Sequence, residues 1–394
     1  MIASRALTGN DLRIEDVWEV AVHRAPVQLA DEARAQMQAA RALVEHASEH
    51  TYGVNTGFGR FVSEDIPAGQ VDELQLRLLR SHACGVGEPY PADVVRAAML
   101  LRANALAKGY SGARVETVEL LVECLNRGVL PRVPSRGSVG ASGDLAPLAH
   151  LALPLVGEGH AWFEGALLDG AAALGAAGLE PTVLRAKEGL SLINGTQFMT
   201  AMGALALVRA WRLARVADLA CALSLESLQG SRTSFHPAIH RVRPLQGQVD
   251  SAANIHLLLD GSAIIESHRW CDKVQDAYSL RCAPQVHGAS RDLIDFAGSR
   301  CEAIDFLQEH YVGPCVFHHV RDALEVVHSI GVLAGVHVED ENPDRGDRVS
   351  KQELATTGHA QKQRKKQEAM PLDDCHLFLR SGWPRRSCRR SRSW

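Results

Sequence analysis

The run GSVGASGD at residues 137–144 sets three glycines around a single serine. Glycine adopts left-handed and closely packed backbone conformations that other residues avoid. In Ala141-Ser142-Gly143 no side chain crowds the glycine amide nitrogen, so in a tightly folded loop this nitrogen can attack the carbonyl carbon of Ala141 and close a five-membered ring. Loss of one water from the ring and one from the Ser142 side chain leaves a methylidene-imidazolone. The run therefore contains the elements of an electrophile made from the backbone alone.

Three other interpretations compete with this one. A phosphate-binding loop requires Gly-Lys-Ser/Thr, and no lysine lies near the run. The serine-hydrolase elbow requires Gly-x-Ser-x-Gly, and Asp144 stands where its second glycine would lie. A plain tight turn is what most Gly-Ser clusters form. The choice between a turn and an electrophile therefore depends on the rest of the chain.

The bulk composition is that of an ordinary globular protein. Of 394 residues, 46% are apolar and 22% charged, and the net charge of −4 is too small to indicate a nucleic-acid partner. The nine cysteines contain no Cys-x-x-Cys pair, so no metal site is expected and the thiols fit a reducing compartment. The N-terminal residues mix acids with apolar residues, unlike a signal peptide, and no stretch reaches about 18 unbroken apolar residues. We expect a cytoplasmic protein without a membrane segment.

Hydrophobic periodicity predicts a mainly α-helical chain. Apolar residues three and four apart, typical of amphipathic helices, occur over 31–47, 94–107 and 113–127, and Gly128 should end the last of these helices. Aromatic residues are few and strand-like alternation is rare.

A longer helix is predicted over 198–229, about 45 Å long at 1.5 Å per residue. It is rich in Ala and Leu on more than one face, so it should be packed on several sides inside a bundle. Short strands are expected near 12–20 and 160–168.

The segment GSVGASGDLAPLAH at 137–150 resembles the signature of the aromatic amino-acid ammonia-lyase family, whose members form the methylidene-imidazolone from Ala-Ser-Gly. Four further segments resemble family motifs in the family's order: YGVNTGFGRF at 52–61, SHACGVGEP at 81–89, EGLSLINGTQ at 188–197 and QDAYSLRCAPQVHGA at 275–289. The resemblance spans roughly residues 5–298. It favours the electrophile over the plain turn.

The resemblance implies a long-helix bundle with a smaller N-terminal domain that carries the Ala-Ser-Gly loop, as in the ammonia-lyase and fumarase-like superfamily. We expect the N-terminal domain at 1–195, the central long-helix bundle at 196–298, and a divergent, incomplete C-terminal region at 299–394. Asp144 is expected to hold the loop by hydrogen bonds to backbone amides. Family members form homotetramers whose active sites are built from several subunits, so an intact chain is expected to do the same.

Within the family, Asn55, His82 and Gln197 resemble the histidine-specific members. The implied reaction is the non-oxidative elimination of ammonia from L-histidine to give urocanate, a step of histidine degradation. The implied prosthetic group is 4-methylidene-imidazol-5-one, formed autocatalytically from residues 141–143 without an external cofactor. Such a group fits the chemistry because it can bind the substrate amine, a poor leaving group, covalently. Tyrosine and phenylalanine ammonia-lyases, and aminomutases on the same scaffold, are the enzyme alternatives.

The catalytic residues that the resemblance implies are the electrophile-forming Ala141, Ser142 and Gly143 together with two tyrosines. Tyr52 is the candidate base for the β-proton of the substrate. Tyr278 is expected to assist at the amine or the ring. A tyrosine beside glycines is by itself more often a packing residue, and the motif reverses that expectation.

The substrate-binding residues that the resemblance implies are His82, Asn194, Gln275 and Arg281. Arg281 would hold the substrate carboxylate, because its planar guanidinium fork matches two oxygens. Asn194 would contact the ring or the carboxylate, His82 the substrate imidazole, and Gln275 the same pocket. If the segment is helical, Arg281 lies three residues beyond Tyr278 and shares its face.

The sequence changes character after about residue 298. Residues 359–394 carry ten Lys or Arg and three Asp or Glu, a net charge of +7, and have neither helical period nor strand alternation. HVEDENP at 337–343 echoes the Asn-x-x-x-Asp-Asn-Pro segment of the family, but no Gly-Gly-Asn-Phe-His follows. The simplest hypothesis is a truncated or frame-disrupted copy, with a nucleic-acid-binding tail or a disordered end as alternatives. A helical remnant without turnover is the corresponding non-enzyme alternative.

Overall fold

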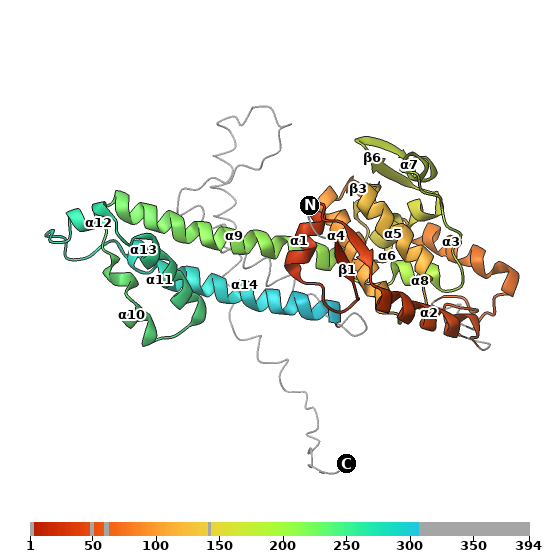
Figure 1. Cartoon of the computed structure of the whole chain (residues 1–394), viewed down its shortest axis with the longest axis horizontal. Helices are drawn as coiled ribbons and strands as arrows, with labels where there is room; N and C mark the ends of the chain where they lie inside the picture. Colours follow the sequence, from red (N-terminus) through yellow and green to blue (C-terminus); the bar gives the residue numbers. More distant parts are fainter. Residues whose placement is uncertain (1–3, 48–50, 59–62, 141–142, 307–394) are drawn as a thin grey trace, which may run out of the picture. The chain divides into compact units, whose positions relative to one another are not determined.

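The computed structural model describes residues 4–47, 51–58, 63–140 and 143–306 of the chain (Figure 1). They belong to the first of two compact units, which spans residues 1–337. The predicted C-terminal region at 299–394 lies outside the described residues from residue 307 onward.

Helices dominate the described residues, which confirms the prediction of a mainly α-helical chain. The α-helices are α1 (Ile14–Ala21), α2 (Asp31–Glu45), α3 (Val71–His82), α4 (Ala92–Ala107), α5 (Val115–Arg127), α6 (Leu145–Ala152), α7 (Gly170–Ala176), α8 (Glu188–Ile193), α9 (Gln197–Ser227), α10 (Pro237–Arg241), α11 (Gln246–Leu258), α12 (Ala263–Ser267), α13 (Tyr278–Arg281) and α14 (Ala283–Phe306). Short 3₁₀ helices are η2 (Ala68–Gln70), η3 (Leu153–Val156) and η4 (Arg232–Phe235). As predicted, α5 ends at Gly128, whose φ of 80° gives a left-handed cap.

Three small sheets accompany these helices in the described part of the chain. The strands are β1 (Arg5–Leu7) parallel to β2 (Val27–Leu29), β3 (Val86–Pro89) antiparallel to β5 (Pro134–Arg136), and the antiparallel set β4 (Leu130–Pro131), β6 (His160–Phe163) and β7 (Ala166–Asp169). The strand prediction near 160–168 is confirmed by the β6–β7 hairpin. Its two turn residues, Glu164 and Gly165, have φ values of 48° and 83°, as a tight hairpin with right-handed strand twist requires.

The strand predicted near 12–20 is wrong, because this segment forms α1. Ile14, Val17, Trp18 and Ala21 are all buried, and their spacing of three and four residues defines one helical face. The carboxylate of Asp16 accepts a hydrogen bond from the backbone N–H of Arg13, at 2.9 Å, which supports the helix start. The apolar residues of this segment also fit a period of two, and contact with the core decides for the helix.

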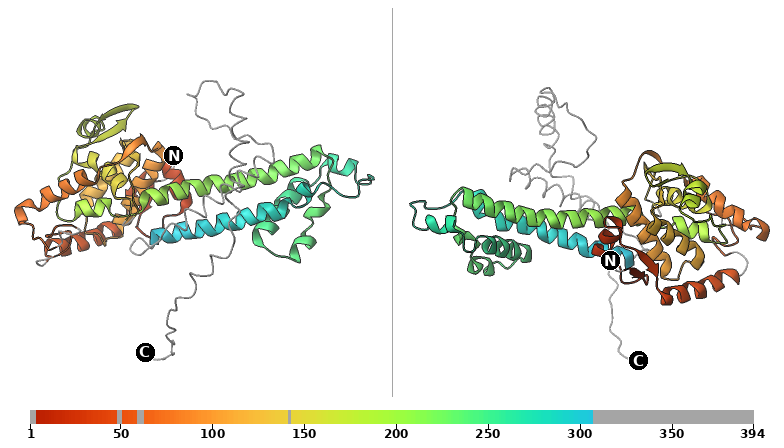
Figure 2. Two further views of the ribbon diagram at one scale, coloured as in Figure 1. Left: turned by 180° about the vertical axis from the view of Figure 1, so that it is seen from behind. Right: turned by 45° about the horizontal axis from the view of Figure 1, so that its top comes forward.

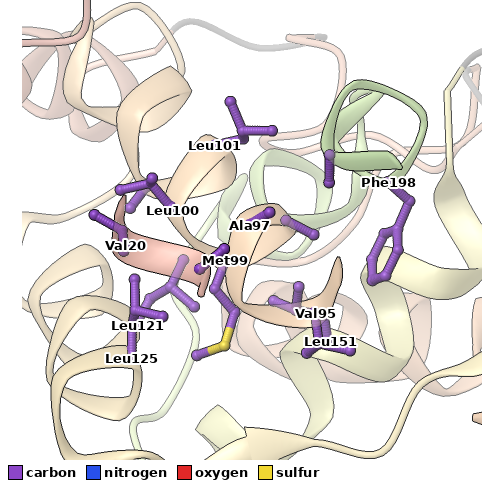
Figure 3. Packing of buried hydrophobic residues seen from close by; sticks show 14 of the residues in the cluster. Val20, Val95, Ala97, Met99, Leu100, Leu101, Leu121, Leu125, Leu151 and Phe198 are labelled. Carbon is purple, nitrogen blue, oxygen red and sulfur yellow. The ribbon is translucent and has the colours of Figure 1, made fainter. Parts of the chain in front are cut away.

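The core centres on α4, which is buried on nearly every side. Figure 3 shows Val95 and Met99 of α4 packed among Leu121 and Leu125 of α5 and Leu151 of α6. A helix with apolar residues on every face belongs in the interior of a protein, and the few polar residues of α4 are buried with it. The helix α4 therefore forms the support on which the surrounding helices are placed.

The 31-residue helix α9 leads away from this core. Helices α1 and α4 pack against its N-terminal half, and α14 runs antiparallel beside it (Figures 1 and 2). The predicted burial on several sides is confirmed for the first half of α9, where Phe198 and Leu205 are 1% exposed. Further along, Val216, Leu219 and Leu223 are 43%, 44% and 56% exposed. Their spacing places them on one open apolar face.

The tract formed by α8 and α9, Glu188–Ser227, is long and apolar enough to cross a membrane when only length and composition are considered. In the folded chain, 61% of its most apolar window is buried inside the protein. Such burial is expected of a core helix, so the tract serves here as the central support of the helical bundle.

A buried charge cluster joins α9, α11 and α14. Asp218 on α9 is 1% exposed and accepts hydrogen bonds from Ser251 and Asn254 of α11 and from His287 and Arg291 of α14. Burial alone would raise the pKa of Asp218, but these hydrogen bonds and the charge of Arg291 outweigh it and hold the pKa below its ordinary value of 3.8. The charged carboxylate therefore ties three helices together.

We expect Asp218→Asn to lower the free energy of unfolding by about 3 kcal/mol at neutral pH, because Arg291 loses its counter-charge. The folded-state pKa of Asp218 is depressed, so its contribution is complete above the ordinary value of 3.8 and is lost as the pH falls through the folded value. Urea unfolding followed by circular dichroism at neutral and acidic pH measures both effects. The exposed Asp272→Asn should change the unfolding free energy by less than about 0.5 kcal/mol. Equal losses in the two variants would contradict the prediction.

Candidate active site

The glycine-serine loop lies between β5 and α6. Gly137, Gly140 and Gly143 all have positive φ, at 151°, 67° and 110°, as the sequence pattern predicted. Ala141 and Ser142, the other members of the predicted electrophile, lie outside the described residues. The described glycines nevertheless locate both ends of the loop.

The backbone of Gly143 rests directly on that of Gly195. A Cβ at position 143 would overlap the carbonyl group of Gly195, so a side chain is excluded there. The next amide, that of Asp144, donates a hydrogen bond to the same carbonyl oxygen at 2.6 Å. This contact brings the loop against the Asn194–Gly195 segment, and Asn194, one of the predicted site residues, is exposed beside it.

Asp144 links the loop to the start of α9. Its Oδ2 accepts a hydrogen bond from the backbone N–H of Met199 at 3.0 Å, which confirms the expected bond to a backbone amide. Its Oδ1 accepts a second bond from the hydroxyl of Ser138 at 2.8 Å. Because the first-turn amides of a helix have no partner within the helix, a carboxylate is favourable at this place.

Tyr52 lies in a turn that packs against α8. Its ring is 48% exposed and meets the ring of Phe58 edge-to-face, with 6.0 Å between centroids. The adjoining Gly53, with φ of 75°, lies so close to α8 that a Cβ would stand 2.7 Å from Leu190. The helix α8 ends at Ile193, directly before Asn194. The candidate base and the candidate amide are therefore placed by the same short helix.

The position of α8 is set by a buried carboxylate at its first residue. Glu188 is fully buried and accepts hydrogen bonds from the Arg114 guanidinium and backbone, from the Thr117 hydroxyl and from the Arg185 amide. The next amide, that of Gly189, donates to the side-chain oxygen of Gln75 on α3 at 3.0 Å. A buried carboxylate with this many donors holds a helix in one place.

His82 is the last residue of α3 and is half-buried. Its Nδ1 lies 2.9 Å from the carbonyl oxygen of Leu78, which can only accept, so Nδ1 is the donor and, in the neutral imidazole, Nε2 is the acceptor. The chain beyond it is held by His150, whose Nε2 accepts the Gly85 amide at 3.0 Å. Burial, with the nearby positive charge of Arg132, lowers the pKa of His150, which keeps this imidazole neutral and able to accept.

The segment after His82 also touches the loop. A Cβ on Gly137 would stand 2.9 Å from the Cα of Gly85. The structure therefore brings the segment after His82 to the Gly137 end of the loop and the Asn194–Gly195 segment to its Gly143 end. Tyr52 lies beside α8, the helix that leads into Asn194.

The remaining candidates lie on and before the short helix α13. Gln275 is exposed and precedes the helix, because the segment 275–281 is helical only from Tyr278 onward. Tyr278 and Arg281 do share a face, with the guanidinium carbon 5.4 Å from the ring centroid. Nε of Arg281 donates to the carbonyl of Asp276 at 2.9 Å, and its terminal nitrogens make no other hydrogen bond among the described residues.

These two groups of candidates lie at opposite ends of α9. The loop is bonded to Met199 in the first turn, whereas Asp276 accepts the amide of Ser231, just beyond the last turn, at 2.6 Å. The 31 residues of α9 separate these points by about 45 Å at 1.5 Å per residue. Within one chain, Gln275, Tyr278 and Arg281 are therefore not brought to the loop.

Two residues outside the predicted set hold backbone segments of the site in place through buried hydrogen bonds. Arg102 of α4 is 5% exposed, and its Nη1 donates to the carbonyl of Asn194 at 2.8 Å and to Oε1 of Gln197 at 3.0 Å. Glu188 begins the EGLSLINGTQ motif but is not among the predicted site residues. An arginine and a glutamate inside apolar stretches are the available signal, because such charges are buried only when paired.

A model of the aromatic amino acid lyase family matches residues 12–303. The histidine ammonia-lyase of Gloeobacter violaceus is 58% identical over 294 residues, which cover 74% of this chain and 57% of that protein. The histidine ammonia-lyase of Myxococcus xanthus is 51% identical over 294 residues, covering 74% of this chain and 58% of that protein. The chain thus spans less than two thirds of the length of these relatives.

Solved structures with the same fold extend this comparison. The tyrosine aminomutase from Streptomyces globisporus aligns with a TM-score of 0.77 at 31% identity, over 93% of this chain and 79% of that chain. The histidine ammonia-lyase from Trypanosoma cruzi aligns with a TM-score of 0.72 at 38% identity, over 84% of this chain and 66% of that chain. Both the sequence match over residues 12–303 and the shared fold assign this chain to the aromatic amino acid lyase family.

Proposed function

We propose that this chain supplies the catalytic part of a histidine ammonia-lyase, which eliminates ammonia from L-histidine to give urocanate. The observation that carries the proposal is the contact of Gly143 with the Asn194–Gly195 segment, because it places the glycine loop beside an exposed side-chain amide. The relatives at 58% and 51% identity are named as histidine ammonia-lyases, which supports histidine as the substrate. Because the chain spans 57% of the first relative, its own turnover is part of the proposal.

The prosthetic group belongs to the same proposal. Family members use 4-methylidene-imidazol-5-one, and here it would form from Ala141, Ser142 and Gly143 without an external cofactor. The described residues fit this group, because Gly143 has a positive φ and its side-chain position is filled by Gly195. Once formed, the group supplies an electrophile for the substrate amine.

The residues around the loop would each perform a defined part of the reaction. Tyr52 would take the β-proton, since its ring is half-exposed on the turn beside α8. His82 would accept a hydrogen bond from an imidazole N–H of the substrate at Nε2, because Nδ1 is already bonded to the Leu78 carbonyl. Asn194 would bind the ring or the carboxylate with its exposed amide.

Arg281 would hold the substrate carboxylate through its terminal guanidinium nitrogens, with Tyr278 and Gln275 in the same pocket. These residues lie about 45 Å from the loop of their own chain along α9, so they would have to serve the loop of another subunit. A homotetramer meets this requirement. The open apolar face of α9, formed by Val216 and its neighbours, supports such packing between subunits.

A cytoplasmic location also belongs to this proposal. The six cysteines among the described residues are all free thiols, as expected in a reducing compartment.

The purified chain is expected to convert L-histidine into urocanate. Ser142→Ala should abolish the product, because the methylidene double bond forms only when the Ser142 hydroxyl leaves as water. Ultraviolet absorbance of the conjugated product measures turnover, and intact-protein mass should show the parent chain lighter by two waters. Tyrosine and phenylalanine are assayed in parallel, with β-amino acids sought by chromatography. Coumarate, cinnamate or a β-amino acid without urocanate would replace this proposal by a lyase or aminomutase for another substrate. Absence of all products and of the mass loss would leave a non-catalytic helical remnant.

Mixing two inactive variants tests the shared site. Tyr52→Phe and Arg281→Lys should each lower kcat/KM by about 10²-fold or more, because one lacks the base and the other the planar fork. When the two are unfolded together and refolded, some sites combine an intact Tyr52 with an intact Arg281, and activity should rise well above either variant alone. Arg300→Lys, an exposed substitution on α14, serves as the control that keeps full activity. If mixing restores nothing while both variants assemble, the two residues do not serve a common site.

A further inference from the structure

An unusual charge lies inside the most buried helix of the fold. Arg102 of α4 is 5% exposed and is flanked in sequence by Leu101 and Ala103, which are almost fully buried. Burying a guanidinium is unfavourable unless it is hydrogen-bonded, so its partners indicate what it is for. Two of its partners are the backbone carbonyl of Asn194 and the side-chain oxygen of Gln197.

Gln197 is the second half of this support. It is fully buried at the first residue of α9, its Oε1 accepts from Arg102, and its Nε2 has no hydrogen-bond partner among the described residues. An unsatisfied buried amide nitrogen is unfavourable by about 1–3 kcal/mol. The Gln197 side chain lies against Gly195, and there its Oε1 accepts a hydrogen bond from Arg102.

Gly195 connects the Arg102–Gln197 pair to the loop. A Cβ on Gly195 would overlap Nη1 of Arg102 and Oε1 of Gln197, so the peptide lies flat on these two polar groups. The backbone of Gly143 contacts the same glycine. Gly195 therefore touches both the Arg102–Gln197 pair and the loop.

We propose that Arg102 and Gln197 are positioning residues for the formation of the prosthetic group: they fix the Asn194–Gly195 peptide, which in turn holds the amide of Gly143 in place for ring closure. This inference rests on the proposed function. It concerns the residues beneath the loop, which take no part in bond formation.

The chemistry explains why a fixed Gly143 matters. Its nitrogen forms a bond to the carbonyl carbon of Ala141, and the proton of this amide passes to the carbonyl oxygen. That oxygen leaves as water with the amide proton of Ser142, and the hydroxyl of Ser142 leaves as a second water with its Cα proton. Amide nitrogen is a weak nucleophile, so closure depends on holding the two atoms in contact, and a displacement of about 1 Å can slow such a step about 10²-fold.

The test compares two buried arginines of the same helix. Arg102→Lys keeps the charge but loses the planar fork, and we expect the rate at which the chain loses two waters to fall about 10²-fold. Arg96→Lys is the matched control, since Arg96 is also 5% exposed but donates to the carbonyls of Val20, Ala21 and Leu125. Intact mass of protein harvested at intervals after induction follows the water loss, and thermal unfolding compares the folded state of the variants.

A second pair of variants separates contact from charge. Gly195→Ala forces a methyl group into the Arg102–Gln197 pair and should also block the mass loss. Gly175→Ala, on the exposed side of α7 with open space around its Cβ, should leave the mass loss complete. If Arg102→Lys does not fold, Gln197→Leu, which removes the acceptor of the pair and keeps Arg102, decides the question.

The outcomes distinguish the two proposals. Slow or absent water loss in Arg102→Lys, with complete loss in Arg96→Lys at equal thermal stability, supports the positioning role. Complete water loss in the parent, Arg102→Lys and Gln197→Leu alike overturns it and leaves the proposed function intact. A parent chain at its full sequence mass contradicts the proposed function, and this inference with it.

Discussion

The contact between the Gly143 and Gly195 backbones constrains everything else in the site. It leaves no room for a Cβ on Gly143, and it joins a loop that follows β5 to the short segment between α8 and α9. Such a close backbone contact persists only if other interactions fix both segments in position. Asp144 holds the loop side through Met199, and the Arg102–Gln197 pair holds the other side.

The helix α9 converts this local constraint into a constraint on assembly. Its first turn is bonded to the loop, and its far end is bonded to the segment that carries Gln275, Tyr278 and Arg281. A continuous helix has a fixed rise, so no rearrangement of side chains brings its two ends together. A reaction that requires residues from both ends must use more than one chain. The apolar face left open on α9 fits the same conclusion.

Local sequence signals predicted the elements whose conformation is decided locally. Gly128 ended α5, the 160–168 segment formed a hairpin, and the glycines of the loop took positive φ. The segment at 12–20 was mistaken for a strand because its apolar residues satisfy two periods, and only contact with α4 and α9 selects the helix. At the start of α13, Asp276 accepts a hydrogen bond from the Ser231 amide and its carbonyl accepts one from Arg281, and these contacts between distant residues are not visible in the local sequence.

The sequence motifs name candidate residues of the site, but they do not reveal the contacts that reach it from a distant part of the chain. Asn194 and Tyr52 stand in short motifs, and the structure places both beside α8. Arg102 is 92 residues from its partner Asn194, and nothing in the helix around it indicates that partner. Such a pair is defined only by the folded chain.

The buried charges explain how apolar helices keep a single register. Helices rich in Ala and Leu can pack in several positions one turn apart with similar burial, because their surfaces repeat every 5.4 Å. Asp218 accepts hydrogen bonds from α11 and α14. Glu188 accepts hydrogen bonds from Arg114 and from Thr117 of α5. A shift of one helical turn would break these bonds while preserving the apolar contacts. A buried ion pair adds little stability compared with apolar packing, but a buried charge that has lost its partner is strongly unfavourable. We infer that these carboxylates select the register, and that the positions of the loop at one end of α9 and of Arg281 at the other depend on it.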